Sequence, residues 1–156
     1  MPVQPRNNIW VVLLLVFVVD CSERREPPNY GEMENLLLSN IDDFEYLSSF
    51  IRQKGLSRIT HDSIYPKGKI DERELTKYRE LLSRLGIYTG VQYHNDDAYV
   101  EVLYWSSGIL DRGEAMIFIR TEKSISEIPY LKDQIDEKDL SCDIIDKTGK
   151  WYICDR

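Results

Sequence analysis

Histidine, cysteine and long apolar runs are scarce in this sequence. Its 156 residues include two histidines and three cysteines, and no two cysteines have the spacing of a zinc site. A glycine-rich phosphate loop and a nucleophile elbow are also absent, so the sequence does not indicate a nucleotide-binding protein or an α/β-hydrolase. We therefore expect no cofactor, no metal and no enzyme activity.

Positive charge is also in short supply. The 20 lysines and arginines are outnumbered by 27 acidic residues, which gives a formal net charge of −7. Phosphate backbones and anionic membrane surfaces attract basic proteins, so we expect no nucleic-acid partner. Contact with a membrane is expected only through an N-terminal lipid or an uncleaved signal, whereas a basic protein partner suits the acidic charge.

The longest apolar run covers residues 9–19 and follows Arg6. As a helix these 11 residues would reach about 16 Å, against roughly 30 Å for a bilayer core, so we expect no membrane-spanning anchor. A short apolar run behind a positive charge is typical of a secretory signal. The alternative is a buried strand or helix of a cytoplasmic protein, although the run has neither a period of two nor a polar face.

Cys21 directly follows this run, in the order Val18-Val19-Asp20-Cys21. The order resembles a bacterial lipoprotein signal, in which the cysteine after the cut receives lipid, and charged Asp20 stands where that pattern has a small residue. We expect a signal peptide at 1–20, a polar tether at 21–30 and a single domain at 31–156. The expected location is the periplasm or the outer membrane of a bacterium, with Cys21 either lipidated or free.

The clearest structured element is an amphipathic helix that begins after Asp71. Asp71 and Glu74 form a capping-box pattern, and Gly86 supplies a left-handed stop. Its apolar stripe consists of Leu75, Tyr78, Leu81, Leu82 and Leu85. Strands are expected at 91–93, 98–105 and 114–120, with this helix as their cover. The predicted fold class is α+β, with one or two helices packed on an antiparallel sheet of about four to six strands.

Weaker patterns surround this unit. Phe44, Leu47, Phe50 and Ile51 form a helical stripe within residues 31–54, which Gly55 ends. Residues 56–65 read as one ragged edge strand, and residues 122–140 as a charged crossing that holds one short helix.

The last hairpin predicts a disulfide. A three-residue loop at 147–149 would close on Gly149 and place Cys142 opposite Cys154. Directly opposed strand residues lie about 4.5 to 5.5 Å apart, within the range of a disulfide. The count also predicts that the two cysteines occupy a hydrogen-bonded position of the ladder. The alternative is a pair of reduced, buried cysteines in a chain that is not exported.

Aromatic residues are the one compositional feature that favours recognition, since tyrosine and tryptophan are enriched in interfaces. Alternate strand residues point to opposite faces, so a wet sheet face would expose some of them. The candidates for partner binding are Tyr99, Tyr104, Trp105, Trp151 and Tyr152, with Ile109 and Leu110 in a loop. The alternatives are that residues 122–140 cover this face and that the loop residues fold back on the core.

Three short motifs carry a resemblance over residues 75–155. They are Leu81-Leu82-Ser83-Arg84-Leu85-Gly86-Ile87, Ser106-Ser107-Gly108-Ile109-Leu110 and Gly149-Lys150-Trp151-Tyr152. In this order they resemble small, uncharacterised exported proteins of Gram-negative bacteria, some of which look like partners of secreted toxins. The resemblance implies a binding role, such as that of a periplasmic immunity protein, and assigns no catalytic residue.

Two other functions stay open from the sequence. One is a structural or assembly lipoprotein of the cell envelope without a toxin partner. The other is a small hydrolase or ligand carrier, which would need a pocket with carboxylates and His61 or His94. Asn95-Asp96-Asp97 after His94 has ordinary turn residues and lacks the spacing of a calcium loop.

Overall fold

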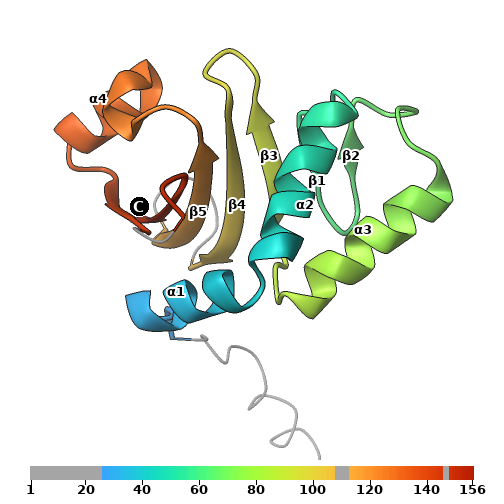
Figure 1. Ribbon diagram of the computed structural model, residues 1–156, viewed down its shortest axis with the longest axis horizontal. Helices are drawn as coiled ribbons and strands as arrows, with labels where there is room; N and C mark the ends of the chain where they lie inside the picture. Colours follow the sequence, from blue (N-terminus) through green and yellow to red (C-terminus); the bar gives the residue numbers. More distant parts are fainter. Residues whose placement is uncertain (1–25, 108–112, 146–147) are drawn as a thin grey trace, which may run out of the picture.

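A single antiparallel sheet forms the centre of the protein. The computed structural model describes residues 26–107, 113–145 and 148–156 (Figure 1). Within them seven strands follow the order β2-β1-β3-β4-β5-β7-β6. The strands are β1 (Arg58–Ile59), β2 (Ile64–Tyr65), β3 (Gly90–His94), β4 (Tyr99–Ser106), β5 (Ala115–Thr121), β6 (Ser141–Ile144) and β7 (Trp151–Asp155).

The antiparallel α+β class is confirmed, but the counts exceed the prediction. The sequence indicated at most six strands and one or two packed helices. Residues 56–65 form a two-strand hairpin instead of one edge strand, which gives the seventh strand. The described helices are α1 (Tyr30–Ser39), α2 (Ile41–Gln53), α3 (Glu72–Arg84) and α4 (Pro129–Asp136), with a 3-10 turn η1 at Ile125–Glu127.

The first two helices come from one predicted helical segment. Asn40 leaves helical geometry at φ −130° and ψ 29°, and its side-chain amide donates to Leu36 O at 2.9 Å. The chain therefore turns between α1 and α2. Tyr30, placed by the sequence at the end of the tether, is the first residue of α1, which Asn29 caps in a box with Glu32. The predicted signal peptide and Cys21 lie outside the described residues.

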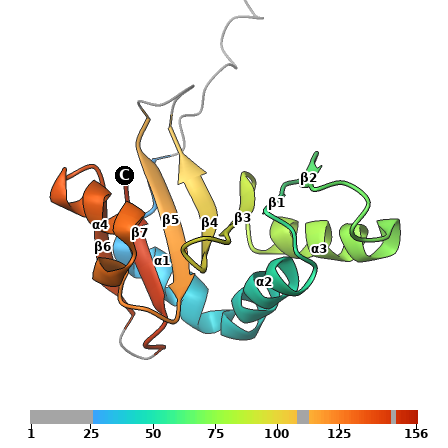
Figure 2. The same ribbon diagram turned by 90° about the horizontal axis from the view of Figure 1, so that it is seen from above.

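Helix α3 has the predicted local structure in a different tertiary position. The Glu74 amide donates to Asp71 Oδ1 at 2.8 Å, and Gly86 follows with φ +70°. Its apolar stripe packs largely on α2, where the rings of Tyr78 and Phe50 lie 5.1 Å apart. In Figure 2, α1, α2 and α3 lie on one side of the sheet, with α3 beyond α2 near β1. The prediction that α3 covers the central strands was wrong, because α2 takes that place.

Two apolar layers lie on opposite faces of the sheet. On the first face, α1 and α2 pack on the sheet. Their apolar side chains, together with those of α3, form one cluster with Val91, Val100, Val102, Phe118, Trp151 and Ile153. The Phe44 ring of α2 meets Phe118 edge-on at 4.9 Å. On the second face, η1 and α4 bring Ile125, Ile128 and Leu131 onto Ile117, Ile119 and Cys154. The predicted crossing at 122–140 therefore covers part of the second face.

Gly90 is required where β3 meets β1. Its φ of +119° is a conformation that side chains other than glycine rarely adopt. A Cβ there would come within 2.4 Å of Ile59 O and 2.9 Å of Thr60 Cγ2. The glycine thus allows the β1–β2 hairpin to join the sheet.

The predicted disulfide is present in the last hairpin. Cys142 pairs with Cys154 in the ladder, with Cα atoms 4.1 Å apart and sulfurs 2.06 Å apart. The predicted ladder position was wrong. Ile145 N donates to Trp151 O at 2.9 Å, and because bonded and non-bonded pairs alternate, the cysteines occupy a non-hydrogen-bonded pair.

The phase of the ladder changed because the hairpin closes one residue earlier than predicted. Ile145 O accepts hydrogen bonds from the amides of both Thr148 and Gly149, so the last bonded pair is 145 with 151 and not 146 with 150. Two residues of this turn, Asp146 and Lys147, lie outside the described residues.

Candidate functional site

Two of the proposed recognition aromatics belong to the core. Tyr99 and Trp151 are each 0% exposed, so the prediction that they form a binding surface was wrong. Trp151 points to the helix side, where its ring lies 5.6 Å from Phe44 and its Nε1 donates to Glu45 Oε1 at 2.8 Å. Tyr99 points to the other face and packs in the layer under η1 and α4.

The other aromatic candidates do not form one surface. Tyr104 packs against the helix-side core, with its ring 5.8 Å from Phe118. Tyr152 packs against the opposite layer. Trp105 is half-buried after the irregularity in the β4–β5 pairing. Ile109 and Leu110 lie outside the described residues.

The exposed part of the second sheet face lies beyond α4. One cross-strand row runs from Tyr65 through Arg58 and Gln92 to Glu101, and continues to Ile119 under the α4 layer. We call the row Tyr65, Arg58, Gln92 and Glu101, together with His94, the open face. Tyr65 is 68% exposed, and Arg58 and Gln92 are exposed as well. Figure 2 shows none of the labelled helices over this side of β1 and β3.

Apart from His94, the residues of the open face were missed in the sequence for a physical reason. Arg58 and Tyr65 lie on two-residue strands, which are too short to show a period of two. The available signal was the alternation along β4, where Tyr99, Glu101 and Leu103 share one face and Val100 and Val102 share the other.

The inner end of the open face holds three polar side chains in contact. The rings of His94 and Tyr99 stack 4.2 Å apart at 9°, and His94 Nε2 lies 3.6 Å from Glu101 Oε2. His94 Nε2 and Tyr99 Oη are buried without a hydrogen-bond partner among the described residues. Burial, and after it the charge of Glu101, raises the pKa of the Tyr99 hydroxyl well above its usual value.

A second polar cluster lies on the helix side and is fully paired. Buried Arg120 donates from Nε to Glu45 Oε2 at 3.2 Å and from Nη1 to Glu122. Lys150 lies 3.0 Å from Glu122 Oε2. The hydrogen bond from Arg120, followed by that from Lys150, lowers the pKa of Glu122. Because the cluster joins α2 to β5 and β7 with its groups satisfied, it acts as a structural tie.

The two histidines lie apart on the fold. His61 Nε2 is 3.0 Å from Ile87 O, ahead of β3, whereas His94 ends β3, so the histidines lie at opposite ends of this strand. The described residues contain no group of three or more His, Cys, Asp or Glu side chains suited to a metal ion. A shallow depression on α2 is lined by Ser49, Arg52 and Gln53, without a nucleophile–base pair.

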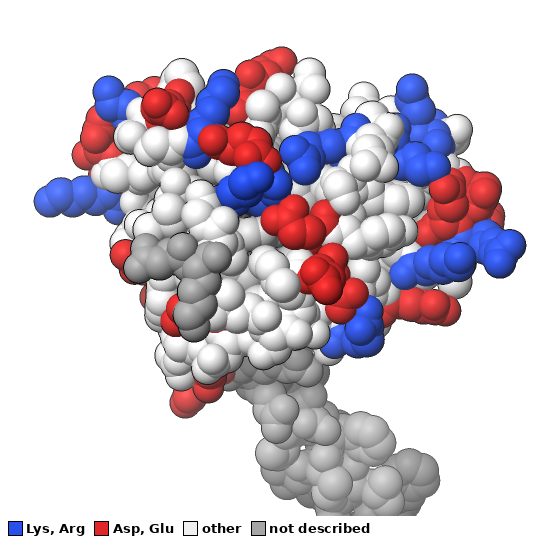
Figure 3. Space-filling view, viewed as in Figure 1, with Lys and Arg blue, Asp and Glu red and all other residues white. Residues whose placement is uncertain are grey.

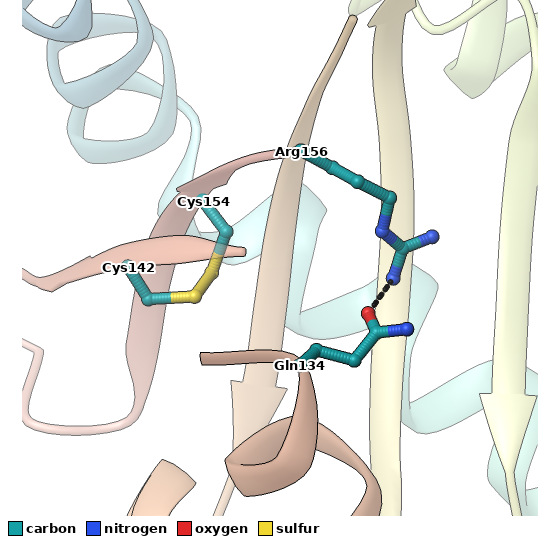
Figure 4. Close-up of a disulfide and its surroundings, with 4 residues drawn as sticks. All are labelled: Gln134, Cys142, Cys154 and Arg156. Atoms are coloured by element: carbon teal, nitrogen blue, oxygen red, sulfur yellow. Dashed lines mark hydrogen bonds between the residues drawn. A yellow bond between two sulfur atoms is a disulfide. The ribbon is translucent and has the colours of Figure 1, made fainter. Parts of the chain in front are cut away.

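The disulfide belongs to the apolar layer that α4 forms on the sheet. It joins the edge strand β6 to β7 (Figure 4). Arg156, just after β7, donates from Nη2 to Gln134 Oε1 at 2.9 Å and so ties the chain end to α4. These contacts fix the layer that borders the open face.

Charge on the helix side is mixed. Acidic and basic side chains are interspersed over the face shown in Figure 3, without a large patch of one sign. No described helix is long and apolar enough to cross a membrane. Comparison of the chain with protein-family models, with curated proteins and with solved structures gave no match.

Proposed function

We propose that this chain is an exported protein of the bacterial cell envelope that binds a protein partner through its open face, as a periplasmic immunity protein would. The observation that carries the proposal is the incomplete cover of the sheet. The helices fill one face and α4 covers the β5–β7 side of the other, which leaves tyrosine, arginine and glutamine exposed on β2, β1 and β3. Tyrosine and arginine are among the residue types that dominate binding energy in interfaces.

The disulfide supports the proposed compartment. Cystines persist in oxidising compartments and are rare in the cytosol, and Cys142 and Cys154 are bonded. Export would use the leader at residues 1–20, with Cys21 as the site of lipid. An acidic domain of net charge −7 suits a basic partner, because opposite charges speed association and favour correct pairs.

The mass of the mature protein tests the export step. The full chain would be expressed in a Gram-negative host and recovered from membrane and soluble fractions. We expect a mature protein that lacks about 20 N-terminal residues and contains the disulfide. If Cys21 is acylated, its mass also includes the lipid. Recovery of the intact chain, with its initiator end uncut, from the cytosol alone would contradict export.

Photo-crosslinking tests the binding step. A benzoylphenylalanine would replace Gln92 on the open face, and a matched control would replace Arg73, which is exposed on α3. We expect a discrete crosslinked species from position 92 and none from position 73, together with lost protection against competitor cells when the gene is deleted. Equal labelling at both positions and unchanged survival would contradict the proposal.

A further inference from the structure

We infer that Glu101, backed by His94 and Tyr99, receives an arginine side chain of the protein partner. This inference rests on the function proposed above and names the chemistry of its binding surface. It concerns the inner end of the open face, where β3 and β4 meet the α4 layer.

Glu101 is a largely buried carboxylate that pairs with no lysine or arginine of the described residues. Its side chain is 12% exposed, and its ion-pair partner is His94 at 3.6 Å, which is a cation only when protonated. Asp43, by comparison, is 28% exposed and pairs with Arg84, and Glu45, 39% exposed, pairs with Arg120. Among the ion-paired carboxylates of the described residues, the least exposed one therefore lacks a lysine or arginine partner, although a buried charge needs compensation most.

Two neighbouring buried atoms are also unpaired. Within the part of the chain that the structure describes, His94 Nε2 and Tyr99 Oη have no hydrogen-bond partner, although Tyr99 is 0% exposed and nearly all buried polar groups in proteins are bonded. The Tyr99 ring stacks on the His94 ring, and His94 Nε2 lies 3.6 Å from Glu101 Oε2. Each offers an acceptor, the neutral imidazole through nitrogen and the hydroxyl through oxygen.

A guanidinium group matches this set better than an ammonium. It carries five N–H donors in a plane, pairs with a carboxylate through two hydrogen bonds and stacks on aromatic rings. It is also less strongly hydrated than an ammonium, so it loses less on entering a half-buried position. Exposed Gln92, which faces Glu101 across the ladder, supplies a polar rim.

A second copy of this chain is the competing occupant. Arg58 is exposed on the same face and lies two strands from Glu101, or about 10 Å at the usual strand spacing. Two copies facing each other would place Arg58 of one near Glu101 of the other. Concentration-dependent signal shifts that vanish in R58Q would show self-association and overturn the assignment to a partner.

Titration of the folded protein with a small probe tests the inference directly. N-acetyl-arginine amide would be added to the isotopically labelled full chain carrying Cys21→Ala, while the His94 ring and Gln92 side-chain signals are followed by NMR. We expect saturable shifts with a dissociation constant in roughly the millimolar range. The isosteric citrulline amide, which is neutral, should produce no saturable shift, and the lysine amide should bind more weakly.

Variants localise the effect. E101Q should weaken binding of the arginine amide by about tenfold or more, as expected for loss of a charge-assisted hydrogen bond. The matched control D143N, on exposed β6, should leave it unchanged. Equal shifts with the citrulline amide, or equal binding by E101Q and the parent, would overturn the inference. The citrulline comparison needs no variant, so it remains decisive if E101Q unfolds.

Partner capture separates this inference from the proposed function. If a partner crosslinks at position 92 equally in E101Q and in the parent, the function stands and the role of Glu101 fails. If no partner is captured while the arginine amide binds in an E101-dependent manner, the proposed function fails and the arginine-binding property of the site stands.

Discussion

Breaking the Cys142–Cys154 disulfide is expected to destabilise the domain by about 3 kcal/mol. The bond joins residues separated by 12 positions. Closing a loop of this length removes about 10 cal/mol/K of entropy from the unfolded chain, or about 3 kcal/mol at 25 °C. For a domain of this size, the melting temperature should fall by about 9 to 12 °C. The edge strand β6 also pairs with β7 in the sheet. Because this pairing does not depend on the disulfide, we expect the fold to survive.

Urea unfolding, followed by tryptophan fluorescence, to which buried Trp151 contributes, provides the measurement. The parent would carry Cys21→Ala, which removes the third cysteine and leaves the disulfide intact. The oxidised parent, the reduced parent and the C142A/C154A variant would be compared. The reduced parent isolates the crosslink from the loss of sulfur packing at Cys154, which is 1% exposed. A difference below about 0.5 kcal/mol between oxidised and reduced parent would refute the entropic argument, and free thiols at both positions in exported protein would refute the bond itself.

Five further substitutions test the packing. R120M should cost about 2 to 3 kcal/mol in urea unfolding, because Glu45 and Glu122 lose a buried partner while remaining partly solvated; no loss would mean that the cluster is not a tie. Glu122 has a pKa lowered from its ordinary value of 4.5 in the folded state, so its contribution to stability is present above that value and is lost as the pH falls through the lowered pKa. E122Q should flatten acid unfolding in that window. G90A should cost more than about 1 kcal/mol by thermal melting, since the new Cβ meets the Ile59 carbonyl. Y99F should be neutral or stabilising by up to about 1 kcal/mol, because its hydroxyl is unpaired, whereas Y78F should lose about 1 kcal/mol with its bond to Leu47 O; the opposite order would contradict the assignment of unpaired atoms.

Local signals predicted local structure well. The capping box of Asp71 and Glu74 and the stop at Gly86 act within one helix, so they were visible in the sequence and are present in α3. The facing of Cys142 and Cys154 was likewise set by a short turn. The hydrogen-bond phase of that hairpin was not, because it depends on which carbonyl closes the turn, and Ile145 does so.

Tertiary cover could not be predicted from the same signals. Tyr99 and Trp151 are each the first residue of a strand, and each is buried by a different layer. Which helix covers which strands depends on long-range packing, so α2 occupies the place predicted for α3. The hairpin at 58–65 supplies Arg58 and Tyr65, two of the five residues of the open face, yet its strands are too short to show a pattern.

The buried polar atoms that lack a hydrogen bond are unevenly distributed over the described residues. Of the three buried side-chain atoms without a hydrogen bond in the described residues, Ser48 Oγ is alone on α2. His94 Nε2 and Tyr99 Oη belong to two stacked rings, and the His94 ring lies beside the largely buried Glu101. Buried polar groups of natural proteins normally have hydrogen-bond partners. Unpaired buried groups are expected where a surface serves a function. The same groups would cost stability in the free protein and become paired when a donor-rich side chain enters. The stability that the free protein loses at this end of the open face is therefore the physical counterpart of the binding proposed there. Y99F should raise the stability of the free protein and weaken the binding.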